Sequence, residues 1–273
     1  MSTPSLSAPQ FSIFTALVED RAGLSYTLAD KSIFESKLWS RALEAGFESA
    51  LDYYYFLRYD DPTGSEMQAL VQTLVVHETF FFRELDALRA AVTYFVKPRV
   101  EAGHRARIWC SACSTGEEPA TLAMLLASTG LLPSVELLAS DISENALIRA
   151  RSGRFTARAL RYKCPPWAEP YLKSVDNGFT VAPELLSAIQ FRRLNLLDRE
   201  AIASVGTLDL IVCRNVLIYF RDDTTRCVVN TLKQQLRPDG ALLVGVSESL
   251  MRFETGLACG EHSGVFVYRK VAS

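Results

Sequence analysis

Residues 107–127 read RIWCSACSTGEEPATLAMLLA, and this stretch decides the fold class. The apolar run 108–113 predicts a strand, the small residues 114–116 predict a tight loop, and the apolar residues beyond Glu118 predict a helix. At such a turn a ligand can lie against the backbone and face the free N–H groups that begin the helix. Because Glu117 and Glu118 would repel a pyrophosphate, a ligand with hydroxyl groups or positive charge fits better than a dinucleotide.

Strand and helix patterns alternate through the rest of the chain. Further strands are expected at 135–140, 189–193, 208–213, 241–246 and 264–269, and helices at 143–151 and 222–236. Alternation at this spacing predicts an α/β fold, with a Rossmann-like doubly wound parallel sheet, right-handed crossovers and helices on both faces. The pattern lapses at about 153–187, where we expect an inserted subdomain at the edge of the sheet.

Residues 11–90 predict a small N-terminal all-helical domain, because they show helical spacing and no convincing strand run. Asp30 can cap one helix and Ser65 another. The expected apolar positions of these two helices are Ile33, Phe34, Leu38 and Ala42, then Ala69, Leu70 and Leu74. We expect residues 1–10 to form a disordered tail, 91–106 a linking helix and loop, and 107–273 the ligand-binding domain.

The composition is that of a soluble globular protein, with 49% hydrophobic and 22% charged residues in a chain of 273. A net charge of −2 gives no reason to expect a nucleic-acid partner. No apolar run is long enough for membrane insertion, and the first ten residues lack the basic and apolar regions of a signal peptide. We expect a cytoplasmic monomer.

Two of the six cysteines match a redox motif, since Trp109, Cys110 and Cys113 fit the W-C-x-x-C of thioredoxin-like proteins. A redox-active pair should open a helix, whereas Cys110 lies in the predicted strand and Cys113 at its end. Buried small side chains are the favoured interpretation, and a thiol–disulfide site is the alternative. The other cysteines show no zinc spacing, so no metal ligands are predicted.

Ligands of doubly wound sheets bind beyond the carboxyl ends of the strands, so the residues there are the site candidates. Asp141 follows the second strand, where it can bind ribose hydroxyls or cap the next helix in competition with Ser143. Asn195 and Asn215 follow the third and fourth strands. Their amides can recognise an adenine edge or an amino-acid group, or they can brace the loops.

Seven short motifs in a fixed order resemble the CheR family of chemotaxis receptor methyltransferases, which depend on S-adenosylmethionine. They are HETFFFR (77–83), SACSTGEEP (111–119), LLASDI (137–142), NLL (195–197), CRNVLIYF (213–220), LRPDG (236–240) and SES (247–249). The resemblance implies a methyltransferase sheet after the helical domain. It also implies methyl transfer to glutamate carboxylates on the helical signalling domain of a chemoreceptor, which yields glutamyl methyl esters and S-adenosylhomocysteine.

The resemblance also implies site residues. Arg83 and Tyr219 match two substrate-facing catalytic positions, where a guanidinium can pair with the carboxylate and a phenol can orient it. Without the resemblance, a surface ion pair and a core aromatic would be favoured for these two. The implied cofactor contacts are His77, Thr79, Arg83, Glu117 or Glu118, Asp141, Asn195, Leu196, Arg214 and Asn215.

His77 stands where the family commonly has asparagine. A ring nitrogen of neutral imidazole either donates or accepts a hydrogen bond, whereas an amide does both. We therefore expect the affinity for the cofactor, and its pH dependence, to be affected at this position.

Two further departures concern the partner. The family's second helix is often strongly basic and is thought to lie along the acidic receptor, but this chain mixes Lys31, Lys37 and Arg41 with Glu35 and Glu44. We therefore expect weaker electrostatic steering. The edge subdomain, which in some members grips a tethering peptide, is short here, so we doubt a pentapeptide tether.

Two other functions compete with the enzyme. One is a sensor or scaffold that binds S-adenosylmethionine without turnover. The sequence distinguishes the enzyme from this alternative only weakly, through the presence of Arg83 and Tyr219. The other is a thiol–disulfide oxidoreductase that uses Cys110 and Cys113.

Overall fold

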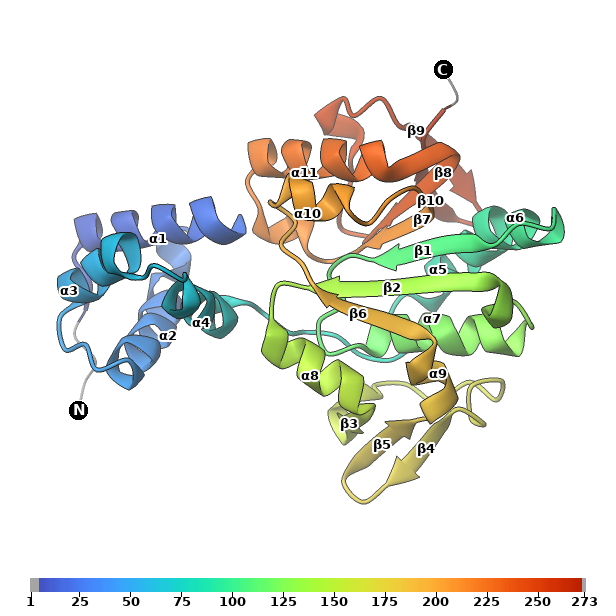
Figure 1. Cartoon of the computed structure of the whole chain (residues 1–273), viewed down its shortest axis with the longest axis horizontal. Helices are drawn as coiled ribbons and strands as arrows, with labels where there is room; N and C mark the ends of the chain where they lie inside the picture. The colour runs from blue at the N-terminus through green and yellow to red at the C-terminus, as the bar shows by residue number, and fades with distance from the viewer. Residues whose placement is uncertain (1–4, 272–273) are drawn as a thin grey trace. The chain divides into compact units, whose positions relative to one another are not determined.

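The computed structural model describes residues 5–271 and divides into two compact units (Figure 1). The first comprises Met1–Val76 together with Tyr219–Arg221, and the second comprises His77–Ile218 and Asp222–Ser273. No helix within residues 5–271 is long and apolar enough to cross a membrane.

The first unit is all-helical over residues 5–76, which confirms the sequence prediction. Its helices are α1 (Ala8–Ala22), η1 (Leu28–Asp30), α2 (Lys31–Glu44), α3 (Ala50–Tyr55), the π-helical η2 (Phe56–Asp60) and α4 (Ser65–Leu74). Phe14, Phe34 and Tyr53 are fully buried in its core. The hydroxyl of Tyr53 donates to Glu66, 2.7 Å away. Tyr53 therefore packs in the core of this unit.

Four local expectations for this unit differ from the structure. Helix α1 begins at Ala8, so residues 8–10 are helical rather than part of a disordered tail, while residues 1–4 lie outside the described part. The Asp30 carboxylate accepts hydrogen bonds from Thr27 rather than from the first turn of α2. Ser65 lies inside α4, where Gly64 is the N-cap residue. Ile33, expected in the core, is 64% exposed.

The second unit is built on a seven-stranded sheet with the order β6-β2-β1-β7-β8-β10-β9. The strands are β1 (Ala106–Cys110), β2 (Val135–Asp141), β6 (Ile189–Arg193), β7 (Leu208–Cys213), β8 (Leu236–Val244), β9 (Ala258–His262) and β10 (Val265–Arg269). All pairs from β6 to β8 are parallel, and β10 pairs antiparallel with both β8 and β9. The sheet is thus mostly parallel, as expected, and β10 alone runs against the others.

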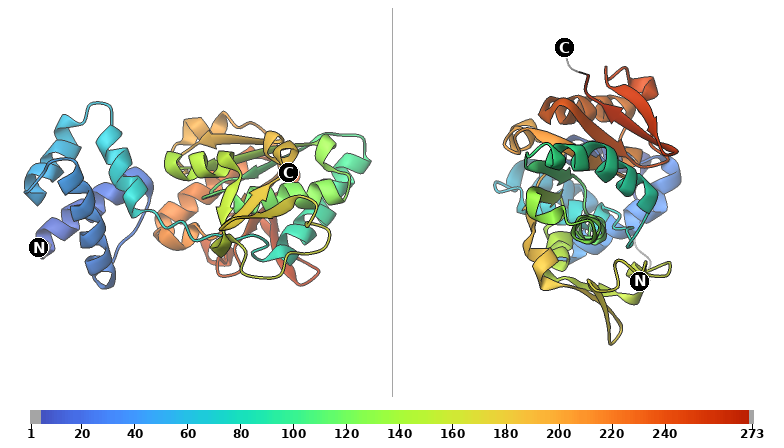
Figure 2. Two further views of the ribbon diagram at one scale, coloured as in Figure 1. Left: turned by 90° about the horizontal axis from the view of Figure 1, so that it is seen from below. Right: turned by 90° about the vertical axis from the view of Figure 1, so that its right-hand side faces the viewer.

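Helices lie on both faces of this sheet (Figure 2). The helices after Val76 are α5 (Leu85–Ala91), the π-helical η3 (Val92–Val96), α6 (Lys97–Glu101), α7 (Glu117–Ser128), α8 (Glu144–Ser152), α9 (Pro183–Ser187), α10 (Arg199–Ala203) and α11 (Asp222–Gln235). Short turns are η4 (Leu132–Ser134), η5 (Ala157–Ala159), η6 (Leu217–Tyr219) and η7 (Met251–Phe253). Every residue of β7 is buried. A strand buried on both faces is typical of the centre of a parallel sheet.

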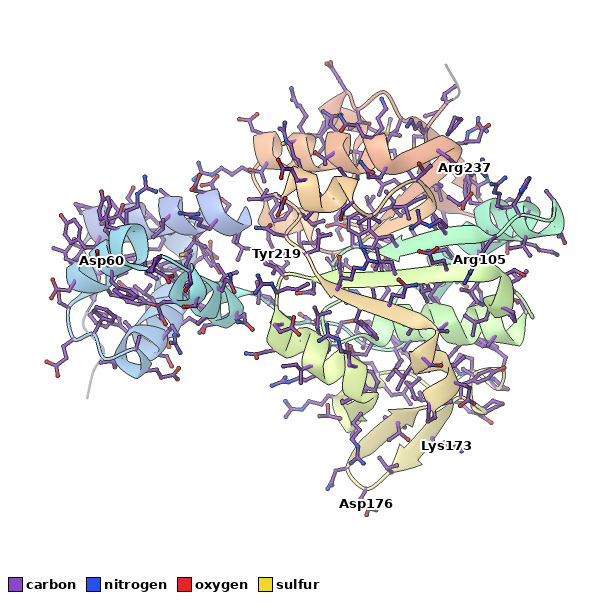
Figure 3. The ribbon with its side chains drawn as sticks, viewed as in Figure 1. Asp60, Arg105, Lys173, Asp176, Tyr219 and Arg237 are labelled. Atoms are coloured by element: carbon purple, nitrogen blue, oxygen red, sulfur yellow. The ribbon has the colours of Figure 1, made fainter. Side chains whose placement is uncertain are left out.

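A separate three-stranded antiparallel sheet forms the inserted subdomain, in the order β3-β5-β4. Its strands are β3 (Arg154–Thr156), β4 (Leu172–Val175) and β5 (Gly178–Val181). A Cβ at Gly178 would lie 1.9 Å from the carbonyl oxygen of Phe155, so only glycine permits this pairing. Lys173 and Asp176 mark the hairpin in Figure 3.

Candidate functional site

The loops that follow β1, β2, β6 and β7 meet at one edge of the sheet. The switch point of the strand order lies between β1 and β7. Backbone hydrogen bonds join the loops, from Ser111 N to Val212 O (2.9 Å), from Cys113 N to Ser140 O (2.8 Å) and from Leu194 N to Asp141 O (3.0 Å). Several strand ends therefore contribute to a single site.

The loop between β1 and α7 brings its backbone close to a neighbouring helix. Ser114 and Gly116 both adopt left-handed conformations, with φ of +50° and +97°. A Cβ at Gly116 would lie 2.7 Å from the Cβ of Ala150 in α8. Glycine is thus required here both by conformation and by space. Because β1 ends at Cys110, the loop is longer than the sequence predicted and includes Cys113.

Asp141 ends β2 and is 8% exposed. One carboxylate oxygen accepts a hydrogen bond from Ser114 N at 2.8 Å, and the other accepts one from Ser143 N at 2.9 Å. The N-cap of α8 is Ser143, whose hydroxyl accepts from Ala146 N. Asp141 is therefore not the cap. Burial raises the pKa of Asp141, while these backbone N–H groups and His77 oppose the rise.

Two carboxylates begin α7 in different surroundings. Glu117 is buried, and its carboxylate accepts from the hydroxyl of Thr115 at 2.7 Å. Glu118 accepts from Arg214 at 2.7 Å. Burial raises the pKa of both glutamates; Thr115 opposes the rise at Glu117, and Arg214 opposes it at Glu118. Both side chains also occupy the positive end of the helix dipole, which favours their charged forms.

Arg214, which follows β7, braces three segments of the site. Its guanidinium lies 2.7 Å from Glu118 and 2.9 Å from Glu84, and it donates to Arg83 O at 2.9 Å. The side chain is 1% exposed. Although burial acts against the charge, the two carboxylates keep the pKa of Arg214 above its ordinary value. Glu84 was not predicted as a site residue, because nothing in the sequence links it to Arg214, which is distant along the chain.

Glu248 is the second residue that sequence reasoning missed. It is 6% exposed, and its carboxylate accepts from the backbone N–H groups of Asn215 and Leu217, at 2.7 and 2.8 Å. Its signal in the sequence is its position directly after the fifth predicted strand, at the same end of the sheet as the other site candidates.

The segment before α5 contains three predicted contacts. His77 places Nδ1 3.3 Å from the hydroxyl oxygen of Ser114, and Thr79 is half-buried. Arg83 donates to Glu78 O at 2.9 Å, and its guanidinium carbon lies 5.6 Å from the ring centre of Phe80. The structure thus connects His77 to the β1 loop, and it connects Arg83 to Arg214 through the Arg83 carbonyl.

The remaining predicted residues lie on other loops. Asn195 accepts from Leu197 N at 3.0 Å and so braces the loop after β6, where Leu196 is buried. Tyr219 belongs to the first unit, where its carbonyl accepts from Ser25 N at 2.8 Å. The direct contacts of all these residues with cofactor or substrate stay predictions.

The redox alternative finds no support in the placement of the cysteines. Cys110 and Cys113 are free and almost completely buried. Burial raises the pKa of both thiols well above the ordinary value, which disfavours the thiolate that disulfide exchange requires. They are packing residues at the end of β1 and in the loop after it.

Carboxylates outnumber guanidinium groups around these loops: Glu84, Glu117, Glu118, Asp141 and Glu248, against Arg83, Arg193 and Arg214. A concave backbone held by Gly116, with ionisable acids beside it, suits a ligand that has ribose hydroxyls and positive charge. S-adenosylmethionine has both, so the residues present fit this cofactor. Asp141 would hold the ribose, and the start of α7 would face the charged remainder.

The comparisons with known proteins agree with this fit. Residues 77–262 match the family model "CheR methyltransferase, SAM binding domain", and residues 9–75 match "CheR methyltransferase, all-alpha domain". Chemotaxis protein methyltransferase 2 of Vibrio cholerae is 32% identical, over 86% of this chain and 83% of that protein. Chemotaxis protein methyltransferase of Escherichia coli is 32% identical, over 91% and 87%.

A further relative, the probable biofilm formation methyltransferase WspC of Pseudomonas aeruginosa, is 31% identical over 95% of this chain but only 61% of its own length. Both domain models and the first two relatives extend over most of the chain. The protein therefore belongs to the CheR family of chemotaxis methyltransferases and binds S-adenosylmethionine.

Proposed function

We propose that the protein transfers a methyl group from S-adenosylmethionine to glutamate side chains on the helical signalling domain of a chemoreceptor, forming glutamyl methyl esters. The observation that carries the proposal is the attachment of Arg83 to the cofactor loops. Phe82 N donates to the hydroxyl of Thr121 in α7, and Arg83 O accepts from Arg214. These contacts hold the backbone of Arg83, whose guanidinium can pair with a carboxylate, next to α7 and Arg214.

The reaction needs little chemistry from the protein. A glutamate carboxylate is ionised at neutral pH, with an ordinary pKa of about 4.3, so no general base is required. The bound cofactor supplies a methyl group on a positively charged sulfur, which leaves as a neutral thioether. The work of Arg83 and Tyr219 is to pair with the carboxylate and orient one oxygen, and good orientation can lower the barrier by about 7 to 11 kcal/mol.

The surface of α2 supports a receptor contact that depends little on free positive charge. Lys31 pairs with Glu35 at 3.4 Å, and Lys37 donates to Leu74 O at 3.0 Å. Arg41 contacts both Glu44 and Glu66. Because these cations are engaged within the unit, we expect receptor methylation to be only weakly sensitive to salt.

The test is the stability of the bond that is made. Receptor protein incubated with the enzyme and methyl-labelled cofactor should gain label that leaves as methanol in mild alkali, because an ester hydrolyses where methylated amines and amides persist. Receptor variants with alanine at the accepting glutamates should take up no label. Label that survives alkali would contradict the proposal, and cofactor binding without any transfer would favour the sensor or scaffold function.

The two substrate-facing residues give a second test. Arg83→Ala and Tyr219→Phe should each lower the rate of methyl transfer by a factor of roughly tens to a thousand, because each removes an orienting donor. Tyr219→Phe should leave cofactor affinity unchanged, as measured by calorimetric titration, whereas Arg83→Ala can affect both. Parent-like single-turnover rates in Tyr219→Phe would show that this residue serves packing only.

A further inference from the structure

Glu248 accepts hydrogen bonds from four backbone N–H groups. One carboxylate oxygen accepts from Asn215 N and Gly245 N, both at 2.7 Å. The other accepts from Leu217 N at 2.8 Å and from Ile218 N at 3.3 Å. These donors belong to the loops after β7 and after β8, so a single side chain joins the ends of two adjacent strands.

The backbone around this carboxylate is closely packed. A Cβ at Gly245 would lie 2.7 Å from the amide nitrogen of the Asn215 side chain and 2.8 Å from a carboxylate oxygen of Glu248. Asn215 itself has φ of +56°, a left-handed conformation that costs free energy in residues other than glycine. The loop after β7 therefore packs closely against both Gly245 and the Glu248 carboxylate.

Resting on the proposed function, we propose that Glu248 is a positioning residue for methyl transfer. Its carboxylate sets the loop that bears Asn215, a predicted cofactor contact, and that continues from Ile218 into Tyr219. A carboxylate can accept hydrogen bonds on both of its oxygens, whereas a side-chain amide has only one accepting oxygen. Glutamine would turn an NH₂ group toward N–H donors and leave buried donors unsatisfied.

Strand β7, whose following loop bears Asn215, provides a matched control at its other end. Asp209, near the start of β7, is 5% exposed, and it accepts from Arg107 N at 2.7 Å and pairs with Arg237. Arg237 and Arg105 mark this end of the sheet in Figure 3. Asp209→Asn therefore disturbs a buried carboxylate of similar kind without touching the loops of the site.

We would compare Glu248→Gln and Asp209→Asn with the parent by thermal unfolding, calorimetric titration with S-adenosylhomocysteine, and receptor methylation. Both variants should unfold at lower temperature. Only Glu248→Gln should lose affinity for S-adenosylhomocysteine, by about tenfold or more. Its rate of receptor methylation should also fall below that of the parent when the cofactor is saturating. Parent-like affinity in folded Glu248→Gln, or an equal loss in Asp209→Asn, would overturn the proposal.

Glu248→Asp covers the case in which the glutamine variant does not fold. This variant keeps both carboxylate oxygens, but its side chain is one methylene shorter. It should therefore fold, and its affinity for S-adenosylhomocysteine should fall by less than about tenfold. Unchanged affinity in this variant would equally overturn the proposal.

Product binding needs no receptor, so the two proposals can fail separately. If the parent methylated no carboxylate while Glu248→Gln still lost affinity, the proposed function would fail and the positioning of the cofactor loop would stand. If alkali-labile label formed equally in the parent and in Glu248→Gln, only the positioning role would fail.

Discussion

Burial governs the acidic residues of the cofactor site. Asp141, Glu117 and Glu118 come from two segments, and burial raises the pKa of each. In the folded protein these groups accept a proton at a higher pH than exposed carboxyls do. The cost of keeping them charged is fully present above the raised pKa and is relieved as the pH falls through it.

This predicts a pH-dependent affinity for S-adenosylmethionine. Protonation of Asp141, Glu117 or Glu118 removes negative charge next to a cationic ligand, so the affinity should fall as the pH is lowered from neutral into the acid range. Calorimetric titration across this range measures it. S-adenosylhomocysteine, which lacks the sulfonium charge, is the control and should show the weaker dependence. Equal pH profiles for the two ligands would contradict the electrostatic account.

Part of the candidate site could be predicted, because strand ends can be located from the sequence. Asp141 and the acidic start of α7 come together as the strand-end rule requires. Glu84 could not be found in this way, since its partner Arg214 meets it only in the folded unit. Arg214 was predicted as a cofactor contact, and the structure adds a bracing role that no local pattern shows.

At the scale of elements, the predictions succeeded where periodicity was strong and failed where pairing decides the structure. The range of β6 and that of β7 match the expected strands residue for residue. Strand β9 was missed, because its sequence ACGEH has no apolar alternation and it forms through antiparallel pairing with β10 at the edge of the sheet. Strand β8 ends at Val244 instead of Val246, where Gly245 turns toward Glu248.

The loop from β1 to α7 gives a prediction at this scale. Gly116→Ala should destabilise the protein and weaken cofactor binding, because the new Cβ would meet Ala150 at 2.7 Å while the left-handed conformation is itself strained. The strain alone is worth about 1 to 2 kcal/mol. Thermal unfolding and titration with S-adenosylhomocysteine measure the two effects.

Gly130→Ala is the matched control for this loop. Gly130 also has positive φ, +71°, but a Cβ there would meet nothing within 4 Å. It should show the strain without the clash and keep the parent's affinity. If both variants bound the ligand as tightly as the parent, the close approach of the loop to α8 would not matter for the site.

At the scale of the whole molecule, the sequence placed the end of the helical domain too late. The expected boundary followed residue 90, whereas the first compact unit ends at Val76 and the matched all-alpha domain ends at residue 75. Helical signals continue through α5 and α6, so pattern alone could not show the break. What separates them is packing, since α5 contacts β8 and β10 of the sheet.

The first unit also includes one short segment from much later in the sequence, Tyr219–Arg221. Ser25 N donates to Tyr219 O at 2.8 Å, and Arg221 pairs with Glu19 at 3.0 Å. Residues of α1 and of the turn after it thus hold the backbone that bears a predicted substrate-facing side chain. The predicted cofactor contacts all belong to the second unit.

This division predicts that Glu19→Gln affects methyl transfer and cofactor binding differently. Loss of the pair with Arg221 should slow methyl transfer and leave affinity for S-adenosylhomocysteine unchanged, because Tyr219 loses support while the cofactor loops do not. An exposed pair is worth at most about 1 kcal/mol, so the rate should fall up to about fivefold. Glu101→Gln, which removes the exposed pair with Lys97 on α6, is the control and should change neither quantity. A matching loss of affinity in Glu19→Gln would show that the helical unit acts on cofactor binding instead of on the placement of Tyr219.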